Sequence, residues 1–144
     1  DLFIGIPHHV GPAPFRDSAV AGPQGWLEVD PHSLATCCRD VYAVGDAAGI
    51  ASSTGSWIPK VGFFAHYEAE VVARNLALHY SNKKPHFRFV GGASGASMLS
   101  GFNRGCFVSI QAYAHPPDGS LSAPKRTAYW TKTLFEKYWL GRWF

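Results

Sequence analysis

The sequence has little of what marks several common classes of protein. No apolar run among its 144 residues reaches the length of a transmembrane helix. The three cysteines are an odd number, and none of their spacings fits a zinc site. The net charge of +3 is mild, so it gives no reason to expect nucleic-acid binding. Only 16% of the residues are charged and 47% are hydrophobic, which indicates a globular chain with a core.

The glycine-rich turn that binds a pyrophosphate is also missing. No G-x-G-x-x-G motif occurs, and Gly91-Gly92-Ala93-Ser94-Gly95 has the wrong spacing. The chain begins at Asp1, without Met, inside an apolar pattern that predicts a strand over residues 2–6. We therefore expect the sequence to be a fragment that lacks the main dinucleotide-binding element.

What is present is organised around one stretch. The apolar run Val41–Val44 predicts a short buried strand, which stops at the pair Gly45 and Asp46. After a loop, Pro59-Lys60-Val61-Gly62 opens a long helical pattern. Glycine has no Cβ, so its backbone can lie against a flat ligand, and an aspartate accepts hydrogen bonds from sugar or polyol hydroxyls. Since a helix N-terminus also presents free N–H groups, the stretch predicts a binding site.

The pattern from Gly62 to Tyr80 predicts the main helix of the chain. Small and apolar side chains recur along one face, so we expect this face to approach a sheet closely. They are Ala65, Ala69, Val72, Ala73 and Leu76. Glu70 and Arg74 are four residues apart and predict an ion pair that faces outward.

The rest of the chain reads as short strands, turns and a final helix. We predict a turn over 91–95, a loop over 116–124 and an aromatic helix over 128–144. Besides residues 2–6 and 41–44, strands are predicted at 27–29, 87–90, 106–110 and 112–114.

Several stretches together resemble a known family. The sequence VYAVGDAA from Val41 and the sequence PKVG from Pro59 are similar to the C-terminal, FAD-contacting part of the pyridine nucleotide-disulfide oxidoreductase superfamily. The branch they resemble most contains sulfide:quinone oxidoreductase and flavocytochrome c sulfide dehydrogenase. The flanking stretches Asp1–His9, Gly25–Pro31 and Lys132–Leu140 also resemble this branch, whereas the likeness is weakest between about Ser81 and Ser122.

The resemblance implies an α/β fold. Residues 1–80 would form the C-terminal half of a doubly wound, Rossmann-like FAD-binding domain, and residues 81–144 a β-hairpin and an amphipathic helix. Asp46 would hydrogen-bond the ribityl chain. Val61 and Gly62, which follow Pro59 and Lys60, would direct backbone N–H groups to the pyrimidine side of the flavin. A helix N-terminus there would stabilise the negative charge of the reduced flavin. Lys60 itself would reach the flavin edge or a quinone oxygen, or else be a solvated loop lysine.

Cys106 has two interpretations. Sulfide-oxidising members of the family keep a cysteine in this region, so the resemblance implies a thiolate that attacks the flavin or carries sulfane sulfur. The run Asn103–Val108 also aligns one strand later, where no cysteine is expected, and Cys106 would then be a buried structural residue. For Cys37 and Cys38, adjacency disfavours a mutual disulfide, and no nearby base predicts reactivity.

The function that the resemblance implies is a FAD-dependent oxidoreductase. It would pass electrons from sulfide or a related sulfur donor to a quinone or cytochrome, and the chain by itself would be inactive. Two alternatives stay open: a type-II NADH:quinone dehydrogenase, which has no need of Cys106, and a non-catalytic interaction domain. The C-terminal helix mixes aromatic with basic side chains, which suits a membrane surface or packing on the domain or a partner.

Overall fold

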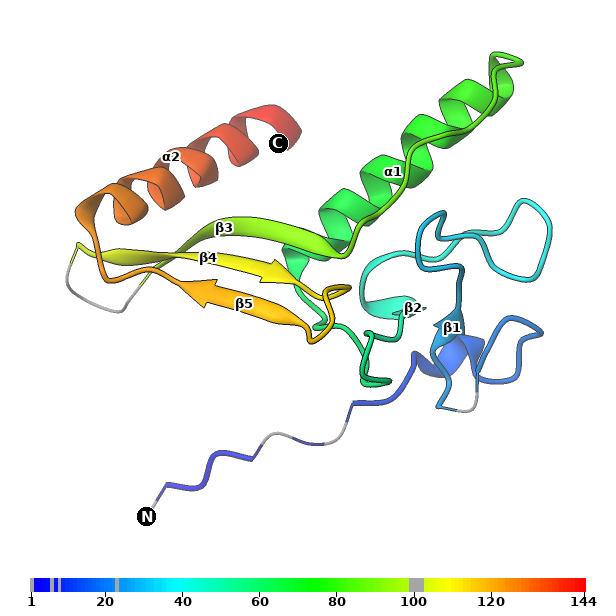
Figure 1. Ribbon diagram of the computed structural model, residues 1–144, viewed down its shortest axis with the longest axis horizontal. Coiled ribbons are helices and arrows are strands. Elements are labelled where there is room, and N and C mark those ends of the chain that lie inside the picture. The colour runs from blue at the N-terminus through cyan, green and yellow to red at the C-terminus, as the bar shows by residue number, and fades with distance from the viewer. Residues whose placement is uncertain (1, 6, 8, 23, 99–102) are drawn as a thin grey trace. The chain divides into compact units, whose positions relative to one another are not determined.

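The computed structural model describes the chain except for residues 1, 6, 8, 23 and 99–102, and it is a mixed α/β structure (Figure 1). The strands β1 and β2 form a parallel pair, and β3, β4 and β5 form an antiparallel sheet in that order. The elements are η1 (Ala13–Phe15), β1 (Leu27–Glu28), η2 (Gly45–Ala47), β2 (Ala48–Gly49), α1 (Gly62–Tyr80), β3 (Gly92–Met98), β4 (Gly105–Gln111), β5 (Asp118–Leu121) and α2 (Arg126–Trp143).

The chain divides into two compact units. The first contains residues 1–51 and 60–89, and therefore β1, β2 and α1. The second contains residues 52–59 and 90–144, and therefore the antiparallel sheet and α2. The division into domains at residue 80 that the resemblance implies stays a prediction.

In the first unit, β1 and β2 align Leu27 with Ala48, so the predicted strand at 27–29 is confirmed at 27–28. The predicted strand over Val41–Val44 is wrong, since only Tyr42 pairs, through a single antiparallel bridge to Ala35. An apolar run becomes a strand only where a second segment supplies a ladder of partners. No described segment runs beside 41–44 for more than that one bridge.

The predicted strand over residues 2–6 is also wrong for residues 2–5, and Ile6 lies outside the described residues. This segment has no regular structure, and the side chain of Phe3 is 92% exposed. Apolar residues gain nothing from an extended backbone unless a core or a neighbouring strand covers them.

The helix α1 has the predicted bounds, Gly62–Tyr80. The predicted buried face is wrong: Ala69 and Ala73 are exposed, and the buried residues are Phe64, Glu68 and Asn75. These three recur at i, i+4 and i+11, which is also one face of a helix. Phe64 turns the helix toward the core because a large apolar side chain gains more from burial than alanine does.

Two further contacts involve α1, and the sequence predicted only the second. Phe64 packs edge-on against Phe89, with ring centroids 5.8 Å apart. The predicted ion pair between Glu70 and Arg74 is confirmed, and both side chains are exposed.

Asn75 fixes the segment that follows α1. Its Oδ1 accepts the N–H groups of His86 and Phe87 at 3.1 and 2.9 Å, and its Nδ2 donates to the carbonyl of Phe87 at 2.9 Å. Phe89 exchanges hydrogen bonds with His32 through its N–H and its carbonyl. The predicted strand over 87–90 is wrong because these partners, and not a neighbouring strand, take its backbone groups.

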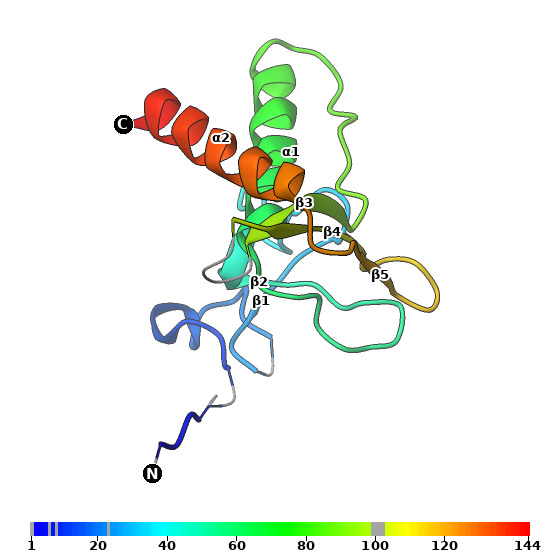
Figure 2. The same cartoon turned by 90° about the vertical axis from the view of Figure 1, so that its left-hand side faces the viewer.

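In the second unit, β4 and α2 are confirmed near their predicted bounds, and α2 covers one face of β3 and β4 (Figure 2). The predicted turn over 91–95 is wrong, since β3 begins at Gly92 and pairs with β4 along its length. The predicted loop over 116–124 contains β5, and the predicted strand at 112–114 is a turn. Glycine and serine have low strand propensity, but pairing with β4 overrides it.

Replacing Asn75 by alanine should remove about 2 kcal/mol from the free energy of unfolding, because two N–H groups and one carbonyl lose their partner. Urea denaturation measures the loss. Glu70→Ala on the same helix is the matched control, since it breaks only an exposed i,i+4 pair and should cost about 0.5 kcal/mol. Equal losses in the two variants would mean that Asn75 does not hold the segment.

Candidate functional site

The turn at Gly45 is shaped by its contact with α1. Gly45 has φ = +65°, a conformation that favours glycine. A Cβ at this position would lie 3.2 Å from the Cβ of Ala65, in the first turn of α1. Glycine therefore lets the helix approach the turn closely, while its proposed contact with a flat ligand stays a prediction.

Glu68 joins the same turn to the next turn of α1. Its carboxylate is 2% exposed and accepts the N–H of Gly45 at 2.5 Å. Burial raises the pKa of Glu68, whereas the Gly45 hydrogen bond and the charge of Lys60 act in the opposite direction. The sequence analysis did not single out Glu68; the available signal was an acidic residue four positions after Phe64, on the same helical face.

Lys60 is half-buried beside this carboxylate. Its Nζ donates to the carbonyl of Ala48 in β2 and lies 4.6 Å from the ring centroid of Trp26. Burial lowers the pKa of Lys60, and the negative charges of Glu68 and Asp46 oppose this. Lys60 is therefore held inside the first unit and is not a solvated loop side chain.

Trp26, whose ring contacts Lys60, has a buried hydrogen-bond donor without a partner among the described residues. The side chain is 7% exposed, and its buried Nε1–H has no hydrogen-bond partner within the described part of the chain. A buried donor without a partner costs free energy, so an acceptor oxygen from a ligand would be favourable there.

Asp46 and the start of α1 offer complementary groups. The Asp46 carboxylate is exposed and makes no hydrogen bond or ion pair with the described residues. The cap residue Val61 supplies no side-chain hydrogen bond, and the first turn of α1 from Gly62 contains no acidic residue. The first N–H groups of the helix can therefore bind an acceptor, while Asp46 can bind a hydroxyl group.

Not every predicted site residue belongs to the first unit. Lys60, Val61 and Gly62 share the first unit with Gly45 and Asp46, whereas Pro59 and Cys106 belong to the second unit. Cys106 lies in β4 opposite Ser97 and is 4% exposed, as its structural interpretation expects. Its redox role stays a prediction.

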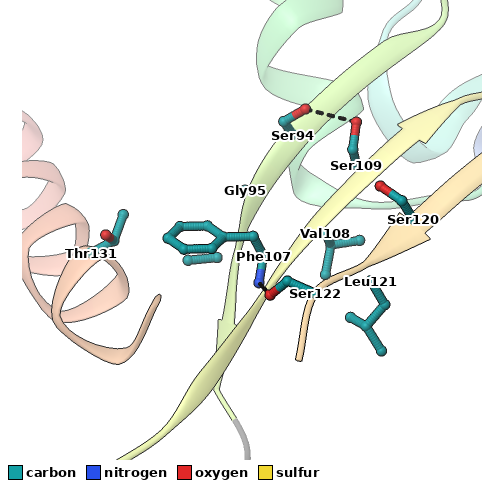
Figure 3. A pocket seen from close by; sticks show the side chains of 10 residues that line it. Ser94, Gly95, Phe107, Val108, Ser109, Ser120, Leu121, Ser122 and Thr131 are labelled. Carbon is teal, nitrogen blue, oxygen red and sulfur yellow. Dashed lines mark hydrogen bonds between the residues drawn. The ribbon is translucent and has the colours of Figure 1, made fainter. Parts of the chain in front are cut away.

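The second unit contains an open cavity of about 520 Å³ on its antiparallel sheet, beside α2 (Figure 3). Ser94 and Ser109 face each other across β3 and β4, with hydroxyl oxygens 3.0 Å apart. Figure 3 shows the ring of Phe107 pointing toward the helix that carries Thr131. The cavity thus combines an aromatic ring with hydroxyl groups.

Among the described residues, no group of three or more His, Cys, Asp or Glu side chains could hold a metal ion. No helix within the described ranges is long and apolar enough to cross a membrane.

The chain matches no protein-family model and no curated protein. The family resemblance therefore depends on the motifs quoted above.

Glu68→Gln should gain stability relative to the wild type as pH rises from about 4 to about 7. A folded-state pKa above the unfolded one stabilises the fold at acid pH, and this contribution is lost as pH rises through the folded pKa. Glutamine keeps an acceptor for Gly45 but does not titrate. Denaturation at both pH values measures the difference; if the wild type gained on the variant instead, Lys60 and Gly45 would more than offset the cost of burial.

Proposed function

We propose that the chain is part of a FAD-dependent oxidoreductase of the sulfide:quinone type. The observation that carries this proposal is the exposed carboxylate of Asp46 next to a turn that packs on the uncapped start of α1. One site thus offers an acceptor for hydroxyl groups and donors for carbonyl oxygens or negative charge. These are the two kinds of partner that the ribityl chain and the pyrimidine edge of a flavin need.

The residues of the first unit fit these parts of FAD. Asp46 would accept a hydrogen bond from a ribityl hydroxyl, and the N–H groups at Gly62 and the next residues would donate to the pyrimidine edge. When bound, FAD supplies two-electron transfer. The partial positive charge at the start of α1 would then stabilise negative charge at that edge, and no acidic side chain in the first turn opposes it.

Glu68 and Lys60 would keep this arrangement in place. Glu68 holds the N–H of Gly45, so the orientation of the turn at Asp46 is coupled to α1. Lys60 holds the carbonyl of Ala48, two residues after Asp46. The cofactor-binding groups would therefore be oriented before the cofactor arrives, which lowers the entropy cost of binding.

Cys106 is the proposed thiol that would carry sulfane sulfur, and the two electrons released when sulfide is oxidised to that level would pass to bound FAD. Because the Cys106 thiol is buried in β4, only a small donor such as sulfide would reach it without a rearrangement. The same burial favours a second candidate, a type-II NADH:quinone dehydrogenase, since that reaction needs no thiol in this part of the chain.

A quinone and a membrane surface are the proposed partners of the second unit. The cavity on the sheet places Phe107, Val108 and Leu121 beside serine hydroxyls, which suits an apolar ring with carbonyl oxygens. On α2, Trp130 and Tyr138 are exposed on the same helix as basic residues such as Lys137, which suits a lipid headgroup region.

Asp46→Ala in the intact protein should weaken FAD binding by about 1.5–3 kcal/mol, since a charge-assisted hydrogen bond to the ribityl chain is lost. Fluorescence titration of FAD measures the change. Asp17→Ala is the control, because it removes an exposed carboxylate of the same unit outside the site and should leave the affinity unchanged. Equal affinities for Asp46→Ala and the wild type would place the flavin elsewhere.

Cys106→Ser in the intact protein decides between the two enzyme candidates. If Cys106 accepts sulfur, the variant should keep FAD bound but lose the bleaching of the flavin by sulfide. Stopped-flow absorbance at the flavin band measures the rate. Bleaching by sulfide at the wild-type rate would remove Cys106 from the mechanism, and bleaching by NADH would then support the dehydrogenase.

A further inference from the structure

Two adjacent thiols lie outside the site described above. Cys37 is exposed and Cys38 is partly buried, and both are free. They belong to the first unit, in the short connection between Thr36 and Val41. A pair of thiols within one turn is a chemical feature that the proposed oxidoreductase does not use.

The backbone around the pair is fixed locally. The Thr36 hydroxyl donates to the carbonyl of Val41 at 3.0 Å and accepts the N–H of Cys38 at 3.2 Å. The N–H of Thr36 also donates to the carbonyl of Val41, at 2.9 Å. The two cysteines are thus held at the ends of one peptide unit whose position depends on Thr36.

Cys37 and Cys38 are adjacent in the chain, so their Cα atoms are only about 3.8 Å apart and both thiols can reach one small ligand. The Cys37 thiol donates to the carbonyl of Ala19 at 3.5 Å. A hydrogen bond with the Cys37 side chain raises the pKa of Cys38. Cys37 also lines an open cavity of about 390 Å³ together with Ala19 and Asp30, so a ligand has access to its sulfur.

Two free thiols on adjacent residues suit one bridging atom better than a direct disulfide or a zinc ion. A disulfide between neighbouring residues forces strain on the peptide bond that joins them, and insertion of a bridging atom enlarges the ring. Zinc needs four ligands, and no group of three or more metal-binding side chains occurs among the described residues. A trivalent arsenic atom that carries one organic substituent needs only two sulfur ligands.

We propose that Cys37 and Cys38 form a binding site for monosubstituted trivalent arsenicals. In the reaction, two S–H bonds and the two As–OH bonds of R–As(OH)₂ break, two As–S bonds form, and two water molecules leave. No electrons are transferred, so no oxidant is needed. The proposal is independent of FAD and of the oxidoreductase function.

Phenylarsine oxide is the probe, and the reduced full chain is the sample. Mass spectrometry should show one arsenical per native chain, with Cys37 and Cys38 blocked and the buried Cys106 free. The adduct should survive excess glutathione, a monothiol, and be removed by 2,3-dimercaptopropanol, because only a dithiol competes with chelation by two sulfur atoms.

Cys37→Ser and Cys38→Ser test the need for both thiols. Each variant should retain the probe at least tenfold less in glutathione than the wild type, while its circular dichroism spectrum stays unchanged. Removal of the wild-type adduct by glutathione would overturn the proposal, as would its survival in either variant or a probe found on Cys106. Ser33→Ala, three residues before Thr36 in the same unit, is the matched control and should retain the probe as the wild type does.

Discussion

The hydrogen bond from the N–H of Gly45 to the buried carboxylate of Glu68 is the contact on which the first unit depends. It joins residues that are far apart in the chain and so links the turn η2 to the second turn of α1. The close approach of Ala65 to Gly45 supports the same link. Because Asp46 follows Gly45 directly, this packing determines where the Asp46 carboxylate lies relative to the start of the helix.

The charges in this cluster are costly to bury, so they have to be arranged together. Desolvation raises the pKa of Glu68 and lowers that of Lys60. The charge of each group opposes the pKa shift of the other. A buried polar or charged group is costly unless hydrogen bonds compensate it. Glu68 accepts the N–H of Gly45 and Lys60 donates to the carbonyl of Ala48, so these two hydrogen bonds favour one packing of α1 on the turn.

The sequence predicts the elements whose patterns are local. The helix α1, the ion pair of Glu70 with Arg74, and the strand β4 depend on periodicity and spacing within one segment. The strand predictions for residues 41–44 and 87–90 were wrong, because a strand forms only where another segment supplies hydrogen-bond partners. For β3 and β5 the reverse holds, because pairing makes strands of sequences rich in glycine and serine.

The residues of the candidate site were also only partly predictable from the sequence. Gly45, Asp46 and Lys60 are noticeable because their residue types and order are unusual, but Glu68 is not, since an acidic residue on a helix normally faces water. The hydrogen bond between Glu68 and Gly45 is seen only in the structure, because a loop and a helical turn separate the two residues in the sequence. The backbone at Cys37 and Cys38 is likewise held by hydrogen bonds of Thr36 that the sequence does not reveal.

A double-mutant cycle between Gly45→Ala and Ala65→Gly tests most directly whether contact between the turn and α1 determines this unit. The added Cβ at Gly45 meets Ala65, so removing the Cβ of Ala65 should recover part of the loss. We expect the double variant to be more stable than the summed single losses predict, by about 1 kcal/mol. Gly55→Ala, where φ is also positive but no atom lies within 4 Å, should be additive with Ala65→Gly. Additive losses for Gly45→Ala and Ala65→Gly would contradict the account.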